Sequence, residues 1–125
     1  PPPGLPVLSC PGDTVYDASD VGLSGALSQI DFTSLTCVTH FSVARNAFTG
    51  SLPTEMALMT ALTFLDLSSN DLEGTLPDLS ALGSLTTAAL ANNRLSGPVD
   101  PALVSLPSLV ELFASHNNFV GCVPT

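Results

Sequence analysis

Residues 65–77 read LDLSSNDLEGTLP, a stretch in which alternating leucines lead to an asparagine and a glycine follows four positions later. Copies in the same register occupy residues 41–53, 88–99 and 112–124, and a weaker copy with valine at the asparagine position occupies residues 16–27. The four asparagines are spaced by 24, 23 and 24 residues. Self-similarity at such a fixed spacing indicates a solenoid, in which every repeat forms one coil and stacks on its neighbours.

Two apolar rhythms follow one another within each repeat. Leu65 and Leu67 alternate with polar residues, which predicts a short strand with one buried face. Upstream of them, Met56, Met59 and Leu62 recur at every third position, which predicts a tight helical or extended return path. Strands of successive coils should pair about 4.8 Å apart in a short parallel sheet. The asparagine amides should satisfy backbone groups that the turns leave unpaired and so form a buried ladder. The members of this ladder are Asn46, Asn70, Asn93 and Asn117.

This pattern resembles the plant-type class of the leucine-rich repeat family, whose repeat reads LxxLxLxxNxLxGxIP. The match covers about residues 14–124, with departures at Val21, Ala88, Asp100 and Ala114. The resemblance implies an α/β-type, right-handed repeat solenoid of about five coils, with a short parallel β-sheet on the concave face and an irregular or 3-10 convex side. The same class occurs in plant receptor ectodomains, extracellular inhibitors and surface antigens, so it does not by itself specify one function.

The composition excludes several classes of function. Two Lys and Arg residues against 11 Asp and Glu give a net charge of −9, which argues against binding to nucleic acid or to an anionic membrane surface. A hydrophobic fraction of 45% is not typical of a disordered chain, and no apolar run reaches the roughly 18 residues of a transmembrane helix. His40 and His116 stand about three coils apart, so we expect no catalytic residue, and we expect no cofactor and no metal site.

The two ends of the chain differ from its middle. We expect a Pro-rich arm over residues 1–13 and a leucine-rich repeat domain over residues 14–125. The expected coils span about 14–37, 38–61, 62–84, 85–108 and 109–125. The arm is either a plain linker in polyproline II conformation or a glycosylated arm, with hydroxyproline or O-linked glycan at Pro1, Pro2 and Pro3. The last coil has no polar cap, so another copy of the chain or a downstream domain should cover it.

Three cysteines bear on the compartment of the protein. Cys10 and Cys37 are 27 residues apart, close to the length of one coil, which predicts a disulfide between the arm and the first coils. Cys122 then has no partner in the chain, and it is free, paired with downstream sequence or paired between chains. A structural disulfide favours an extracellular protein.

Side chains on the outward face of the strands are the candidates for binding. The candidates are His40, Ser42, Arg45, Phe64, Asp66, Thr87, Asn92, Glu111, Phe113 and His116. The chain has no Trp, and Phe64 and Phe113 are the aromatic anchors of this face, so a plainly solvated sheet is the alternative interpretation.

We interpret the protein as a non-enzymatic module of an extracellular or matrix glycoprotein, with a structural or adhesive role and assembly through its end. The alternative is a recognition ectodomain that binds a peptide or protein on the concave strand face. A third hypothesis, binding to ice, depends on a column of threonine hydroxyls. The members of this column are Thr14, Thr39, Thr63 and Thr86.

Overall fold

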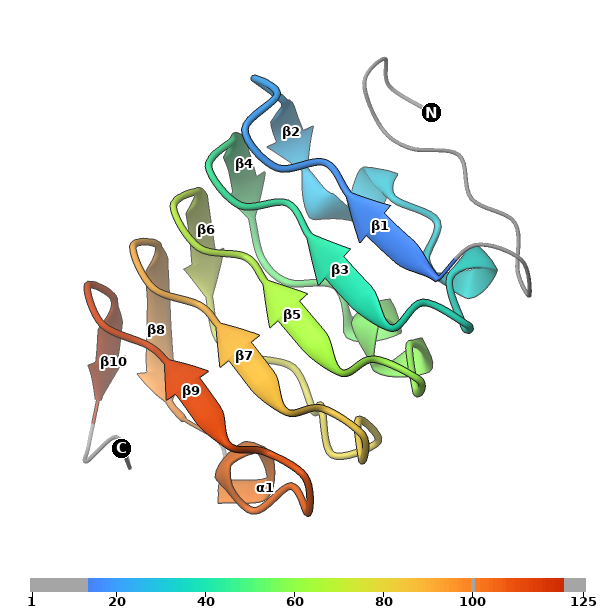
Figure 1. The fold of residues 1–125 in the computed structure, drawn as a ribbon. Helices are drawn as coiled ribbons and strands as arrows, with labels where there is room; N and C mark the ends of the chain where they lie inside the picture. Colours follow the sequence, from blue (N-terminus) through green and yellow to red (C-terminus); the bar gives the residue numbers. More distant parts are fainter. Residues whose placement is uncertain (1–13, 100, 121–125) are drawn as a thin grey trace.

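The computed structural model describes residues 14–99 and 101–120 of the chain. In these residues the chain winds through stacked coils, and every coil contributes one strand to a parallel front sheet (Figure 1). The strand order in this sheet is β1-β3-β5-β7-β9, so each strand pairs with its counterpart one coil away. The strands are β1 (Val15–Asp17), β3 (His40–Ser42), β5 (Phe64–Asp66), β7 (Thr87–Ala89) and β9 (Glu111–Phe113). The predicted sheet and the leucine-rich repeat architecture are confirmed.

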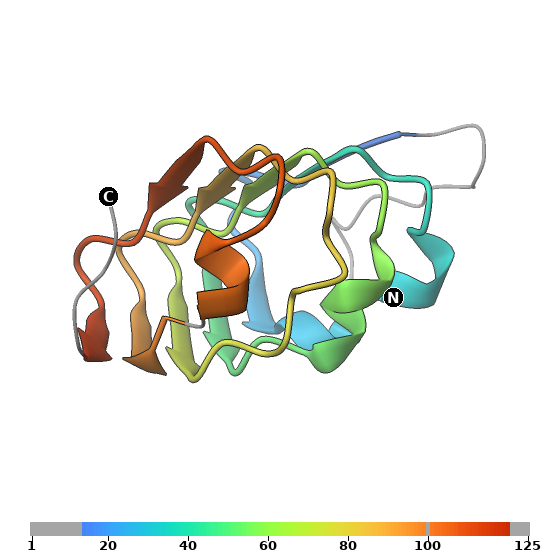
Figure 2. The same cartoon turned by 90° about the horizontal axis from the view of Figure 1, so that it is seen from below.

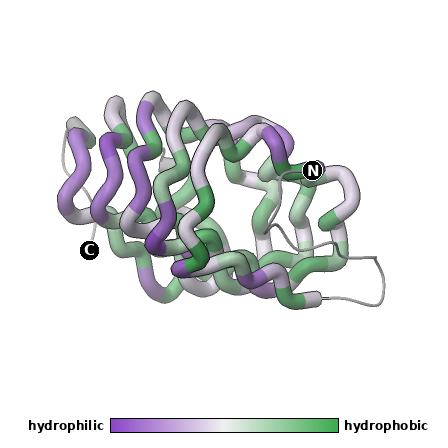
Figure 3. The backbone as a smooth tube through the Cα atoms, turned by 90° about the horizontal axis from the view of Figure 1, so that it is seen from above, coloured by the Kyte–Doolittle hydropathy of each residue, from purple (hydrophilic) through white to green (hydrophobic). Residues whose placement is uncertain are grey.

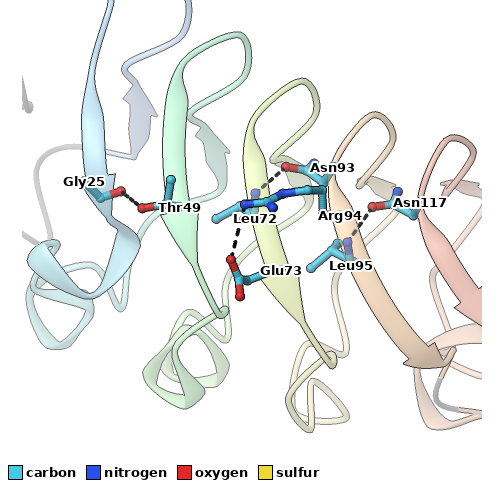
Figure 4. Close-up of polar contacts among 8 residues, drawn as sticks. All are labelled: Gly25, Thr49, Leu72, Glu73, Asn93, Arg94, Leu95 and Asn117. Carbon is cyan, nitrogen blue, oxygen red and sulfur yellow. Dashed lines mark hydrogen bonds and ion pairs between the residues drawn. The ribbon is translucent and has the colours of Figure 1, made fainter.

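A second parallel sheet, here called the rear sheet, stands behind the turns of the coils and was not predicted from the sequence. Its order is β10-β8-β6-β4-β2. The strands are β2 (Ser24–Ala26), β4 (Ala47–Gly50), β6 (Asp71–Gly74), β8 (Arg94–Pro98) and β10 (Asn118–Val120). They form because the chain leaves every asparagine turn in an extended conformation, next to the same segment of the adjacent coil. Glu73 and Arg94 form an exposed ion pair across two of these strands, with 3.3 Å between their charged atoms (Figure 4).

The convex side closes each coil with short and varied structure (Figure 2). It contains the 3-10 turns η1 (Leu27–Gln29), η2 (Phe32–Ser34) and η3 (Thr54–Leu58), and one short helix, α1 (Pro101–Val104). All differences in repeat length fall here. From the rear-sheet glycine of one coil to the threonine of the next, the spacing is 14, 13 and 12 residues in the first three coils. The spacing from that threonine to the following asparagine is always seven residues.

Large apolar side chains fill the space between the sheets and the convex segments. In the first coils the Tyr16 and Phe41 rings stack with centroids 4.9 Å apart, and Phe32 packs against Phe41 at 5.7 Å. In the next two coils leucines and methionines take these places and are fully buried. Figure 3 shows hydrophilic segments lined up where the coils turn, with hydrophobic segments between them. Leu106, in the coil expected over residues 85–108, is also buried.

The asparagines lie where the front strands end, and each one joins two coils. Asn70 is 7% exposed, and its Nδ2 donates to the carbonyls of Leu67 and Ser68 in its own turn and to that of Val43 one coil earlier. Its Oδ1 accepts from the backbone N–H of Phe48, at 3.1 Å. One amide therefore satisfies three carbonyls and one buried N–H that no regular structure would pair.

The same arrangement repeats along the stack. The Oδ1 atoms of Asn93 and Asn117 accept from the N–H groups of Leu72 and Leu95, at 3.1 and 3.0 Å (Figure 4). Asn46 serves the first coil through the N–H of Leu23, where valine stands at the asparagine position. The ladder is thus made of bonds between neighbouring coils, each formed by an asparagine and the coil before it.

Candidate functional site

The outward side chains of the front sheet form two parallel rows, which we call the open face. Strand pairing sets both rows in register. The first row is Val15, His40, Phe64, Thr87 and Glu111, and the second row is Asp17, Ser42, Asp66, Ala89 and Phe113. All ten side chains are exposed or half-buried, whereas Phe41 and Leu65, at the centres of two strands, are fully buried.

Seven of the ten candidate residues lie on these two rows, and the structure therefore brings them onto one surface. The other three, Arg45, Asn92 and His116, lie at the rim, in the turn that ends each strand. Two exposed members of the rows, Val15 and Asp17, were not among the candidates. Asp17 could have been found from the sequence, because Asp17-x-Ser19 repeats the Asp66-x-Ser68 pattern two coils later.

The rim residues share an unusual backbone conformation. Arg45, Asn92 and His116 have φ values of 56°, 60° and 57°, in the left-handed region, and Asp20 and Ser69 occupy the same position in their coils. Non-glycine residues adopt this conformation at a cost of about 1–2 kcal/mol, so the surrounding turn must hold them in it. The result is a row of side chains at fixed intervals along the rim.

The position just before the rim residue is less open than the two rows in most coils. Ala44 is fully buried there, Ser19, Ser68 and Ala91 are half-buried, and Ser115 alone of the five is exposed. At this point the chain is already entering the turn, and the Ala44 carbonyl accepts from the N–H of Asp20 at 2.9 Å. The open face consequently ends at the second row.

Two rings lie side by side in the first row. His40 on β3 and Phe64 on β5 stack with ring centroids 5.9 Å apart and an interplanar angle of 29°. The Nδ1 atom of His40 is 3.1 Å from the hydroxyl of Thr39, which fixes one edge of the imidazole. His40 is exposed and Phe64 is half-buried, so both aromatic rings are accessible on the first row.

Two carboxylates in the second row are held by serine residues. Oδ1 of Asp66 accepts from the N–H and the hydroxyl of Ser68, at 3.0 and 2.6 Å, and Oδ1 of Asp17 accepts the same two bonds from Ser19 at the same distances. The Ser19 hydroxyl, assisted by its N–H, lowers the pKa of Asp17. One oxygen takes both bonds in each case, and a carboxylate has about four lone-pair sites, so capacity to accept from a ligand remains.

The threonine column has a structural use. The hydroxyl of Thr63 donates to the Thr39 carbonyl at 3.0 Å, and the hydroxyl of Thr86 donates to the Thr63 carbonyl at 2.8 Å. Thr39 donates in the same way to Thr14, at 3.2 Å. These hydroxyl protons join adjacent coils, and the geometry therefore does not favour the array of free hydroxyls that binding to ice requires.

Several expectations concern features that the structure reports only in part. Within residues 14–99 and 101–120 no group of three or more His, Cys, Asp or Glu side chains could hold a metal ion. Among the same residues no helix is long and apolar enough to cross a membrane. Pro1, Pro2, Pro3, Cys10 and Cys122 lie outside the described residues, so the glycan, the Cys10–Cys37 disulfide and the state of Cys122 stay predictions.

Comparison with known proteins matches this chain to leucine-rich repeat proteins. A family model described as Leucine Rich Repeat matches residues 61–82. Receptor-like protein 35 of Arabidopsis thaliana is 35% identical over 104 residues, which are 82% of this chain and 10% of that protein. This chain spans about a tenth of the length of the curated relatives it matches.

Solved structures of plant receptors have the same fold. The plant peptide hormone receptor RGFR1, in complex with RGF2, is 29% identical with a TM-score of 0.81, over 89% of this chain and 18% of that one. The Arabidopsis receptor kinase HAESA, in complex with the peptide hormone IDA and the co-receptor SERK1, is 36% identical with a TM-score of 0.75. That match covers 82% of this chain and 17% of the HAESA chain.

Proposed function

Because the chain belongs to the plant-type leucine-rich repeat family, we propose that it is a non-enzymatic, extracellular recognition module that binds a peptide or protein on its open face. The observation that carries the proposal is the open face itself. It is a sheet surface of two registered rows, with a stacked ring pair and oriented carboxylates, and no described element covers it.

The physical form of this surface suits an extended ligand. Parallel strands about 4.8 Å apart repeat the same backbone position in every coil, so a chain laid across them meets a new side chain of each row at every strand. The similar receptors RGFR1 and HAESA were solved with peptide hormones, which supports a peptide or protein as the class of ligand here.

A structural or adhesive role through end-to-end assembly is the second candidate. It is favoured by the apolar side chains of the last coil, where Leu109, Leu112 and Phe119 are half-buried and Val110 is 81% exposed. The similarity to plant receptors supports recognition over assembly. Light scattering of the 125-residue chain over a range of concentrations separates the two: a constant mass favours recognition, and growth with concentration favours assembly.

Selection from a random peptide display library tests recognition directly. The full chain should enrich peptides, and Phe64→Ala should abolish their binding, because it removes the ring at the centre of the open face. Leu58→Ala is the matched control, since Leu58 is an exposed apolar residue, 43% accessible, on the convex side. Failure to enrich any peptide, or equal loss in both variants, would contradict the proposal.

A further inference from the structure

The first three coils of the open face combine two carboxylates with the ring pair. Asp17, Ser42 and Asp66 occupy one row, so the carboxylates are two strand spacings apart, about 10 Å. Phe64 lies on the same strand as Asp66, two residues earlier, and therefore points to the same side at a separation of about 7 Å. Stacking with His40 fixes the ring, and the serine bonds fix the carboxylate.

The charge of this surface has one sign. The two rows carry the carboxylates of Asp17, Asp66 and Glu111 and contain neither Lys nor Arg. The described cation nearest to the rows in sequence, Arg45, lies at the rim, and it contributes only a minor lowering of the pKa of Asp17. The chain as a whole has a net charge of −9, so its field also favours cations over anions.

We propose that this surface selects an extended peptide that carries two basic side chains, and this inference rests on the recognition role proposed above. Asp17 and Asp66 each bind one basic group. The Phe64 ring contacts the aliphatic stem or the guanidinium of the side chain that Asp66 binds, because the face of an aromatic ring attracts a cation. Three residues of polyproline II chain span about 9.3 Å, close to the distance between the carboxylates, so basic residues at positions i and i+3 match the site.

Two blocked synthetic peptides of identical length test the inference. One carries arginine at positions i and i+3 of a proline-rich frame, and the other replaces both arginines with citrulline, a neutral side chain of nearly the same shape. Titration calorimetry against the full chain should give binding for the arginine peptide that weakens as salt rises, because the charges are partly exposed. The citrulline peptide should bind at least tenfold more weakly.

A matched pair of variants locates the site. Asp66→Asn should weaken binding of the arginine peptide by about three- to tenfold, the effect of a partly exposed charge pair. Asn can still accept from Ser68, so the turn is retained. Asp78→Asn is the matched control, because it removes the same charge from a similar turn on the convex side. In that turn Oδ1 of Asp78 accepts from the Ser80 N–H at 3.0 Å. This variant should leave the affinity for the arginine peptide unchanged.

Each outcome of these measurements decides the inference. Equal binding of the two peptides, no binding of either, or equal effects of the two variants would overturn the selection for basic side chains. The display library reports separately on the proposed function: neutral peptides that still depend on Phe64 would retain recognition and reject the basic ligand. Circular dichroism of both variants before titration confirms that they are folded.

Discussion

Asn70→Ala removes one rung of the ladder by deleting the side-chain amide, and the structure shows which groups lose their partners. The carbonyls of Val43 and Leu67 keep a second donor, since the amides of Asn46 and Asn93 donate to them at 2.9 Å. The Ser68 carbonyl keeps the N–H of Arg45, also at 2.9 Å. The buried N–H of Phe48 differs, because it donates to Asn70 itself.

The magnitude follows from that single group. A buried donor left unsatisfied costs about 1–3 kcal/mol, and the three carbonyls add little because each retains a bond. We therefore expect a loss of about 1–3 kcal/mol in the free energy of unfolding. With a denaturant dependence of about 1–3 kcal/mol per molar urea for small proteins, the midpoint of unfolding should fall by about 0.3–3 M.

Urea unfolding followed by circular dichroism measures this shift. Asn118→Ala is the matched control, because Asn118 is an exposed asparagine at the start of β10, and its loss should change stability by less than about 0.5 kcal/mol. Equal effects at the two asparagines would refute the reasoning, and so would a change below about 0.5 kcal/mol at Asn70.

Three further predictions rest on other parts of the fold. Gly97→Ala should lower the melting temperature more than Gly22→Ala, as thermal melts of the two variants can show. Both glycines have φ above +70°, but a Cβ at Gly97 would meet a threonine methyl at 2.7 Å, while nothing lies within 4 Å of a Cβ at Gly22. Burial raises the pKa of Tyr16 to about 12, so stability should fall as pH rises from about 10 towards 12, where the phenol ionises more readily in the unfolded chain. Tyr16 is the only tyrosine, so its phenolate absorbance reports this directly, and a midpoint near 10 in the folded chain would contradict it. Peptide mapping without reduction should recover Cys10 linked to Cys37, and two free thiols in freshly isolated protein would reject that pairing.

Much of the fold could be predicted because the signals are local. The alternation through Leu65 and Leu67 gives the front strand, and Asn70 marks its turn, so the parallel sheet follows from repetition alone. The rear sheet could not be read in the same way. Its strands are three to five residues long, and a segment such as Ala47–Gly50 becomes a strand only because the corresponding segment of the next coil lies beside it.

The candidate site was predictable in position but not in conformation. The repeat placed His40 and Phe64 in one row, whereas their stacking depends on the spacing of the strands. The left-handed turn could not be inferred from residue type: Asn92 tolerates it readily, but Arg45 and Ser69 do not favour it. The same turn forms at Asp20 in the first coil, where valine stands in place of asparagine, so the backbone there is set by the coil and not by the residue that occupies it.

The uneven length of the convex segments has a consequence for how such a chain can evolve by insertion, deletion and duplication. From threonine through asparagine to glycine the spacing never varies, because the asparagine ladder, the threonine bonds and both sheets depend on it. An insertion within that block would break the register between its own coil and the two neighbouring coils. An insertion on the convex side displaces nothing beyond its own loop, as the advances of 14, 13 and 12 positions already show. Duplication of a whole coil also preserves the hydrogen bonds between adjacent coils, since each coil bonds chiefly to its two neighbours. The protein can therefore lengthen, shorten or acquire new loops while the rows of its open face stay aligned.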